Sequence, residues 1–195
     1  ANVSTTGGSI SLRANDELAN AAKREAGTGN ILIALGISLN TGGNSITLAI
    51  GTGPNPGAIT ATNVSTTGTV RLTSAGDLTL GGTVAGLALE QGYRGAVTLG
   101  RDLAVTGDVF LTGGTFAPGS QTLTVGGNWT NRGGTFEPGT SSIIFVDASK
   151  PSTIEGSNTF YNFTAVTPAK KLFFEAGETQ AVLGAFTLRG AKFQL

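Results

Sequence analysis

The sequence predicts an all-β fold, a single-stranded parallel β-helix or β-solenoid with coils of about 20 residues. The phrase GGTFAPGS at 113–120 recurs as GGTFEPGT at 133–140, an offset of 20 residues. Apolar positions recur with the same period in the second half of the chain. The chain has 31 glycines among 195 residues, with abundant Thr, Asn and Ser, which favours strands and turns over helices. We expect one domain over 1–195, with right-handed coils because parallel crossovers are right-handed.

The most regular expected element is one short strand that returns in five successive units. Apolar residues alternate with other residues along it, so two columns of side chains should point inward. The first column is Leu103, Leu123, Ile143, Phe163 and Leu183, and the second is Val105, Val125, Phe145, Ala165 and Ala185. In a parallel solenoid, such columns become apolar ladders between coils stacked about 4.8 Å apart.

Before residue 112, shorter strand patterns are separated by glycine corners. The expected strands are 8–13, 31–35, 37–39, 45–50, 58–62, 69–73, 77–80, 96–99, 102–105 and 108–111. Segment 51–57 reads as a protruding loop. Segment 14–30 differs, because its stretch 15–27 is rich in Ala, begins with capping residues and closes with Gly27. This pattern predicts a helical excursion or cap over 14–30. The alternative for this segment is a recognition element displayed on the solenoid.

The distribution of aromatic residues divides the chain in two. Residues 1–92 contain no Phe, Tyr or Trp, so we expect slim coils with an aliphatic interior there. All the aromatic residues lie in 93–195, where the coils must house rings or be capped by them. Core filling explains most of these rings. As an alternative, Trp129 and Tyr161 are candidate contacts for a glycan, since an amphipathic ring could stack on a pyranose.

The ends of a solenoid expose strand edges that can pair with other chains. Segment 14–27 is expected to cap the N-terminal end. Lys170, Lys171 and Lys192 are expected to discourage pairing at the other end, because lysine blunts exposed strand edges.

Composition excludes several kinds of chemistry. With no Cys and no His, the chain has no disulfide, no thiolate or imidazole metal ligand and no Ser-His-Asp triad. Zero formal net charge and 12% charged residues argue against nucleic-acid binding. The longest apolar run, 31–35, is too short to span a membrane. We therefore expect no enzyme activity, no cofactor and no metal site.

Two more specific possibilities are also disfavoured. The acidic residues are scattered, and Asp102 and Asp108 are each expected to serve a turn. An ice-binding face needs Thr-x-Thr ranks on consecutive coils. Here Thr60-Ala61-Thr62 and Thr122-Leu123-Thr124 are isolated.

Several phrases carry a resemblance to known repeats. Segments 57–68, 70–80 and 81–84 resemble the β-helical repeats of filamentous-haemagglutinin-like exoproteins. Segments 122–130, 134–140 and 156–163 look like repeats of very large bacterial surface proteins. The resemblance implies an extracellular or cell-surface bacterial β-helix that serves as an adhesin, a stalk or an envelope structure, and it supplies no site residues.

Three functions stay open at this point. The first is a structural or adhesive rod, a module of a secreted or cell-surface protein whose neighbours are further coils of a longer chain. We expect the chain to be a mature product or an excised piece of something longer. The second is a subunit that stacks end to end with its own copies into an extracellular filament. The third is a carbohydrate-binding module whose partners are host or cell-surface glycans.

Overall fold

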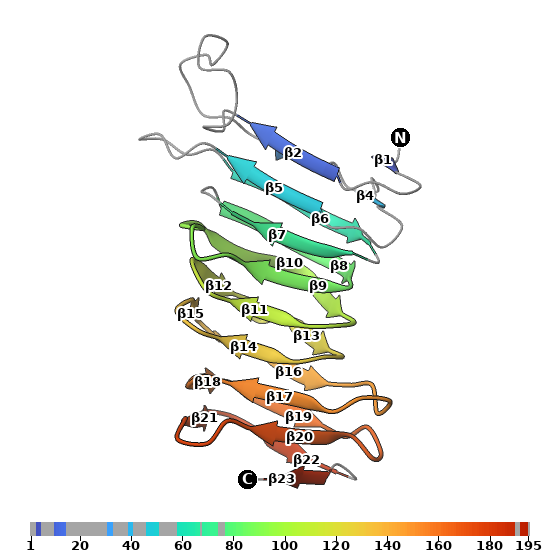
Figure 1. The fold of residues 1–195 in the computed structure, drawn as a ribbon, viewed down its shortest axis with the longest axis vertical. Helices are drawn as coiled ribbons and strands as arrows, with labels where there is room; N and C mark the ends of the chain where they lie inside the picture. Colours follow the sequence, from blue (N-terminus) through green and yellow to red (C-terminus); the bar gives the residue numbers. More distant parts are fainter. Residues whose placement is uncertain are drawn as a thin grey trace.

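The computed structural model is a β-solenoid in which parallel strands stack coil upon coil (Figure 1). It describes residues 3–4, 10–14, 31–32, 39–40, 46–50, 58–66, 68–73, 77–189 and 192–194. The two ends of the chain lie at opposite ends of the stack (Figure 1). Every strand pairing in the described residues is parallel, and these residues contain no helix. The predicted fold class is therefore confirmed.

One sheet has nine strands and runs the whole length of the stack. Its strands are β2 (Ile10–Ala14), β5 (Ile46–Ile50), β7 (Thr69–Leu72), β9 (Gly86–Leu89), β11 (Val109–Leu111), β14 (Trp129–Asn131), β17 (Ser152–Glu155), β20 (Lys171–Phe174) and β23 (Lys192–Gln194). Each strand comes from a different coil, and its neighbours in the sheet are the equivalent strands of the coils on either side.

A ten-stranded sheet forms the opposite wall. Its main path is β3 (Ile31–Leu32), β6 (Ala58–Ser65), β8 (Asp77–Val84), β10 (Ala96–Val105), β13 (Thr122–Val125), β16 (Ser142–Phe145), β19 (Asn162–Ala165) and β22 (Phe186–Leu188). Off this path, β12 (Thr115–Ala117) pairs with β10, and β15 (Thr135–Phe136) pairs with β12. Two further pairs stand apart, β1 (Val3–Ser4) with β4 (Leu39–Asn40) and β18 (Asn158–Phe160) with β21 (Gln180–Val182).

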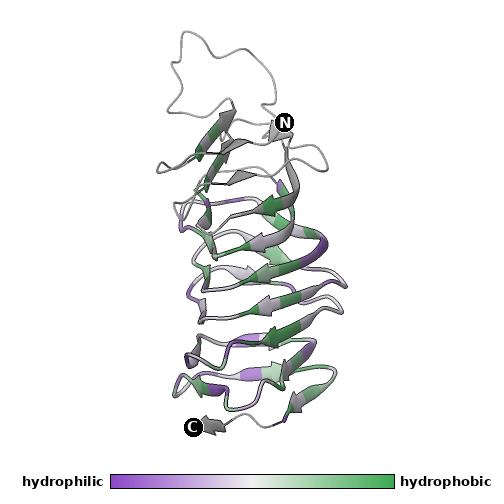
Figure 2. Ribbon diagram, turned by 90° about the vertical axis from the view of Figure 1, so that its right-hand side faces the viewer, coloured by the Kyte–Doolittle hydropathy of each residue, from purple (hydrophilic) through white to green (hydrophobic). Residues whose placement is uncertain are grey.

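The core is built from columns of inward side chains. Leu103, Leu123, Ile143 and Phe163 are neighbours in register on successive coils, and all four are buried. Hydrophobic stretches therefore recur at the same place in coil after coil (Figure 2). Since each residue's partner lies one coil away, the predicted 20-residue ladder is confirmed through these four coils.

The ladder ends differently from the prediction. Phe186, and not Leu183, pairs with Phe163, because the last coil is three residues longer than 20. Leu183 is 66% exposed and Ala185 is exposed as well, so neither belongs to its predicted column. The extra residues lie around the turn that follows β20 and in the bend between β21 and β22.

The long strands are a second difference from the predicted elements. The expected strands 96–99 and 102–105 are one strand, β10, which changes register between Leu99 and Leu103. The expected strand 58–62 extends to Ser65 as β6. Ala14 belongs to β2, and the helix predicted for the rest of 14–30 lies outside the described residues, as does the loop 51–57.

Corners in the second half use a Pro-Gly turn repeated at the 20-residue spacing. Gly119 and Gly139 have φ of 69° and 55°, a region that glycine adopts without steric cost. A Cβ atom on Gly139 would lie 2.5 Å from the carbonyl oxygen of Gly119. The repeated glycines therefore let successive corners stack directly on one another.

Candidate functional site

Three ion pairs of the described residues lie on the outward face of the nine-stranded sheet, which we call the charged face. A fourth, between Lys150 and Asp147, lies in the turn at 147–150. Arg71 on β7 pairs with Glu90 in the next coil. Three coils further along, Arg132 pairs with Glu155 at 3.3 Å and with Glu175 at 2.8 Å. Each pair on the charged face joins different coils, because the partners lie at least 19 residues apart.

Arg132 and its two glutamate partners form a cluster on this face in which the pKa values of Arg132 and Glu175 are shifted. The backbone N–H of Gly156 donates to Glu175 at 2.8 Å, and this bond is the main cause that lowers the pKa of that carboxyl, with Arg132 as the second. The hydrogen bond and charge of Glu175 raise the pKa of Arg132. Both shifts favour the charged forms of Arg132 and Glu175, and the cluster ties together the coils of β14, β17 and β20.

Several acidic and amide side chains accept hydrogen bonds from the backbone of the following coil. Asp77, Asp102 and Asp108 accept N–H groups of Ala96, Thr122 and Asn128 at 3.0, 2.8 and 2.7 Å. Asn128 and Asn162 repeat this arrangement further down the stack. These side chains replace missing strand hydrogen bonds at the bends, so their main contribution is to hold one coil on the next. Asp108 serves a corner as predicted, whereas Asp102 lies within β10.

Lys170 is buried inside the corner between β19 and β20. Its ammonium donates to the carbonyl oxygens of Gly126, Asp147 and Lys150 at 3.2, 3.1 and 3.1 Å. Its exposed fraction is 0%, and this burial lowers its pKa against the opposing effect of the Asp147 carboxylate. The expectation that Lys170 protects an open strand edge is therefore wrong, because it closes a cage of carbonyl groups instead.

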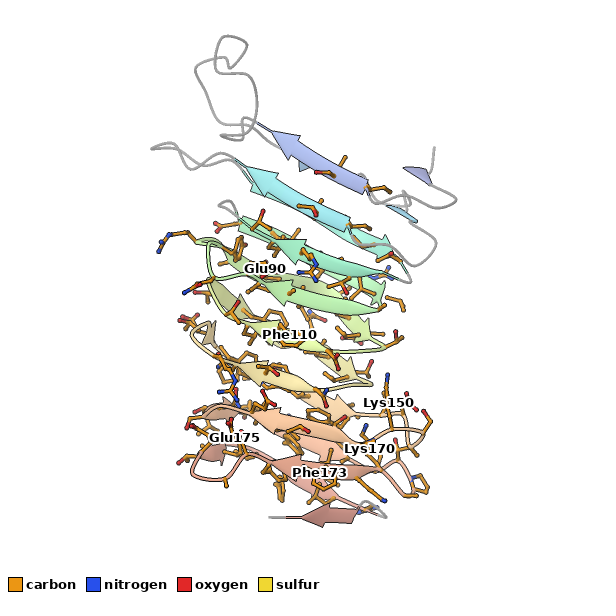
Figure 3. All side chains as sticks on the ribbon, in the orientation of Figure 1. Glu90, Phe110, Lys150, Lys170, Phe173 and Glu175 are labelled. Atoms are coloured by element: carbon orange, nitrogen blue, oxygen red, sulfur yellow. The ribbon has the colours of Figure 1, made fainter. Side chains whose placement is uncertain are left out.

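Lys150 occupies the equivalent position one coil earlier. Its ammonium donates to the carbonyl oxygen of Thr106 at 3.4 Å, and it reaches back 44 residues, as Lys170 does to Gly126. Figure 3 shows the two lysines in neighbouring coils at one edge of the stack, with Glu175 at the opposite edge. The 20-residue spacing of the two lysines is the signal in the sequence that marks these equivalent positions.

The two residues considered as glycan contacts do not form a platform. Trp129 is 0% exposed, and its indole Nε1 donates to Asn158 Oδ1 at 2.8 Å inside the core. Its ring packs against Phe136 and Phe160 with centroids 4.8 and 5.4 Å apart. Tyr161 is partly buried at the bend between β18 and β19. Trp129 is therefore a core residue and offers no face to a ligand.

An apolar cavity of about 500 Å³ opens near the C-terminal end of the stack. Its lining residues are Phe160, Phe163, Phe174, Glu175, Ala176, Gly177, Glu178, Gln180, Val182 and Phe186. Phe186 is 56% exposed, although its ring lies only 5.6 Å from that of Phe163. The aromatic core therefore continues to this end of the described chain and is incompletely covered there.

The described residues bring together no group of three or more Asp and Glu side chains that could hold a metal ion. Within the same residues, no helix has the length and apolar character needed to cross a membrane. The chain matches no protein-family model, no curated protein and no solved structure.

Proposed function

We propose that this chain is a structural and adhesive β-solenoid rod, a module of a secreted or cell-surface bacterial protein. The observation that carries the proposal is the use of its polar side chains. Asp77, Asp102 and Asp108 each bind a backbone N–H of the next coil. These are the groups that an acid–base mechanism would use, so the proposal includes no enzyme activity and no cofactor.

The construction of the stack supports a rod. Each coil contacts its neighbours through two continuous parallel sheets, so stability is close to a sum of coil terms and nearest-neighbour interfaces. Such a stack gains length without needing a larger core. Lysine and arginine side chains that span coils add polar links to the hydrophobic columns.

The extracellular, bacterial location is the part of the proposal that rests on the sequence. It is supported by the cysteine-free, Thr- and Gly-rich composition and by the resemblance to exoprotein repeats. A surface with zero formal net charge disfavours a nucleic-acid partner. The partners expected for the rod are further coils of a longer chain and surface glycans.

An antibody raised against the chain tests location and size together. Applied to intact cells of the source organism, it should label the surface, and an immunoblot should show a polypeptide several times heavier than 19.5 kDa. Labelling that appears only after permeabilisation would reject the surface rod.

A second candidate, end-to-end assembly, is favoured by the apolar cavity at the C-terminal end. Phe186 lines this cavity and is 56% exposed, and Leu183, in the bend between β21 and β22, is 66% exposed. A second copy stacked head to tail would cover them and extend the sheets, and such a contact does not close on itself. Sedimentation at rising concentration should then show open-ended growth, which Phe186→Glu should abolish. A single species at all concentrations would reject this assembly.

A further inference from the structure

A depression of about 450 Å³ opens on the charged face over β9, and we call it the notch. Its lining residues are Thr69, Arg71, Ala85, Gly86, Ala88, Glu90, Gly107, Asp108, Phe110 and Thr112. They come from three successive coils, because β7, β9 and β11 are neighbours in the nine-stranded sheet. The volume falls within the range of small-ligand sites, which is roughly 300–1,000 Å³.

The floor of the notch exists because β9 has almost no outward side chains. Its outward residues are Gly86 and Ala88. On the β7 side they are in register with Thr69 and Arg71, and on the β11 side Ala88 is in register with Phe110. A Cβ atom on Gly86 would lie 2.7 Å from Thr69 Oγ1, so no side chain fits there without displacing that threonine. The depression is therefore built into the sequence of three strands.

The two walls are chemically different. Arg71 forms one wall. Its ion pair with Glu90, which also lines the notch, fixes the position of the guanidinium. Phe110 forms the other wall and is 43% exposed, so this large hydrophobic side chain faces solvent. Since neighbouring strands are about 4.8 Å apart, the backbones of β7 and β11 lie about 9.6 Å apart. Figure 3 shows Glu90 and Phe110 on this same face.

The polar groups around the notch both donate and accept hydrogen bonds. Arg71 carries five N–H donors, and a carboxylate has about four acceptor sites. Asp108 therefore keeps acceptor capacity beyond the bond from Asn128 N–H. One cation and two carboxylates surround the depression, so an anionic ligand is repelled. An uncharged polyol with one apolar face satisfies both the polar groups and Phe110.

We propose that the notch binds one pyranose unit of a neutral polysaccharide. The apolar C–H face of the sugar packs against Phe110 above Ala88, and its hydroxyls exchange hydrogen bonds with Arg71, Glu90 and Asp108. This inference rests on the adhesive part of the proposed function and gives it a substrate class. It uses a different face of the molecule from Trp129 and Tyr161.

The test measures retention of the purified 195-residue chain on four immobilised neutral polysaccharides, namely cellulose, a β-1,3-glucan, an α-mannan and a galactan. Retention on at least one of them is expected. Ala88→Leu, which fills the notch from its floor, and Phe110→Ala, which removes a wall, should each lower the association constant at least tenfold. Phe173→Ala is the matched control, because it removes an aromatic ring from the same sheet face outside the notch, and it should stay within twofold.

Two results would overturn the proposal. They are retention on none of the four polysaccharides, and equal retention of the two notch variants and the wild type. Phe110 is exposed, so Phe110→Ala keeps the fold and the test remains decisive even where Ala88→Leu does not fold. Surface labelling of cells without polysaccharide retention rejects the sugar site and supports the surface rod. Retention without surface labelling rejects the surface rod and supports the sugar site.

Discussion

Between Ala58 and Val105 the ten-stranded sheet is made of long strands, whereas from Thr115 onward the same path is divided into short ones. The strands β6, β8 and β10 have 8, 8 and 10 residues and run across a bend without interruption. Downstream, β12 and β13 have 3 and 4 residues and are separated by a Pro-Gly turn. The coil therefore gains a separate third side in the second half.

The side chains on the path explain this division. Leu78, Val97, Phe116 and Phe136 are neighbours in register, so one inward column changes from aliphatic to aromatic. In the opposite sheet, Val109 is followed in register by Trp129. Rings from the third side then pack on the indole, with Phe136 at 4.8 Å. The comparison teaches that the same arrangement of coils accommodates an aliphatic or an aromatic core. The aromatic core requires an added Pro-Gly turn, which makes room for the rings.

A charge on the inward face should be the most damaging change in both halves. Leu80 upstream and Leu123 downstream are each 0% exposed, and Asp at either position buries an unpaired carboxylate. We expect each variant to lose more than about 4 kcal/mol of unfolding free energy, measured by urea denaturation with circular dichroism. Thr124→Asp, which faces outward, should lose less than about 1 kcal/mol. Wild-type stability of Leu123→Asp would show that its column is wrongly placed.

Truncating one side chain in an inward column should cost more unfolding free energy in the aromatic core than in the aliphatic core. Trp129→Ala removes an indole from the ring cluster together with its bond to Asn158, so it should cost about 3–5 kcal/mol. Val109→Ala, one coil earlier in the same column, should cost only about 1–2 kcal/mol. Chemical denaturation of both variants measures the difference. Equal losses would mean that the rings do not carry the downstream core.

The carbonyl cage around Lys170 belongs to the second half, and its loss should destabilise the coils there. Lys170→Met leaves buried carbonyl groups of Gly126, Asp147 and Lys150 without their donor, which should cost about 2–3 kcal/mol. Lys150→Met removes an exposed ammonium and should change the stability by about 0.5 kcal/mol or less. Thermal melting compares the two, and a larger loss for Lys150→Met would contradict the assignment.

The smallest expected effect concerns pH. The folded state lowers the pKa of Glu175 from its ordinary value of 4.5, so its carboxylate stabilises the fold above pH 4.5. That contribution is lost as the pH falls through the lowered pKa. Glu175→Gln should therefore flatten the decrease in melting temperature between pH 5 and pH 3. Arg132→Leu should flatten it less, because the Gly156 N–H is the larger cause, and the reverse order would contradict this ranking.

The sequence was sufficient for the coil and its main ladder, because identical side-chain types recur every 20 residues from Leu103 to Phe163. It failed at Leu183, since three extra residues around two bends shift the register and no local pattern marks them. Trp129 was open to misreading as a surface ring, although Val109 twenty residues earlier indicates an inward column. The burial of Lys170 could not be predicted from sequence, because its acceptors belong to turns of other coils. The notch was also missed, since it depends on small residues on β9 between larger ones on β7 and β11.

The central claim is that, in the described strands of both halves, each residue's register neighbour lies in the adjacent coil. The chain has no Cys, so paired cysteines report this directly. Thr83→Cys with Ala104→Cys upstream, and Thr124→Cys with Ile144→Cys downstream, join register neighbours about 4.8 Å apart, within the Cα–Cα range of disulfides. Thr124→Cys with Thr164→Cys lies two coils apart, about 9.6 Å, and is too far. Non-reducing mass analysis should show rapid disulfide formation in the first two pairs and none in the third. Cross-linking of the third pair, or of neither neighbouring pair, would contradict the stack.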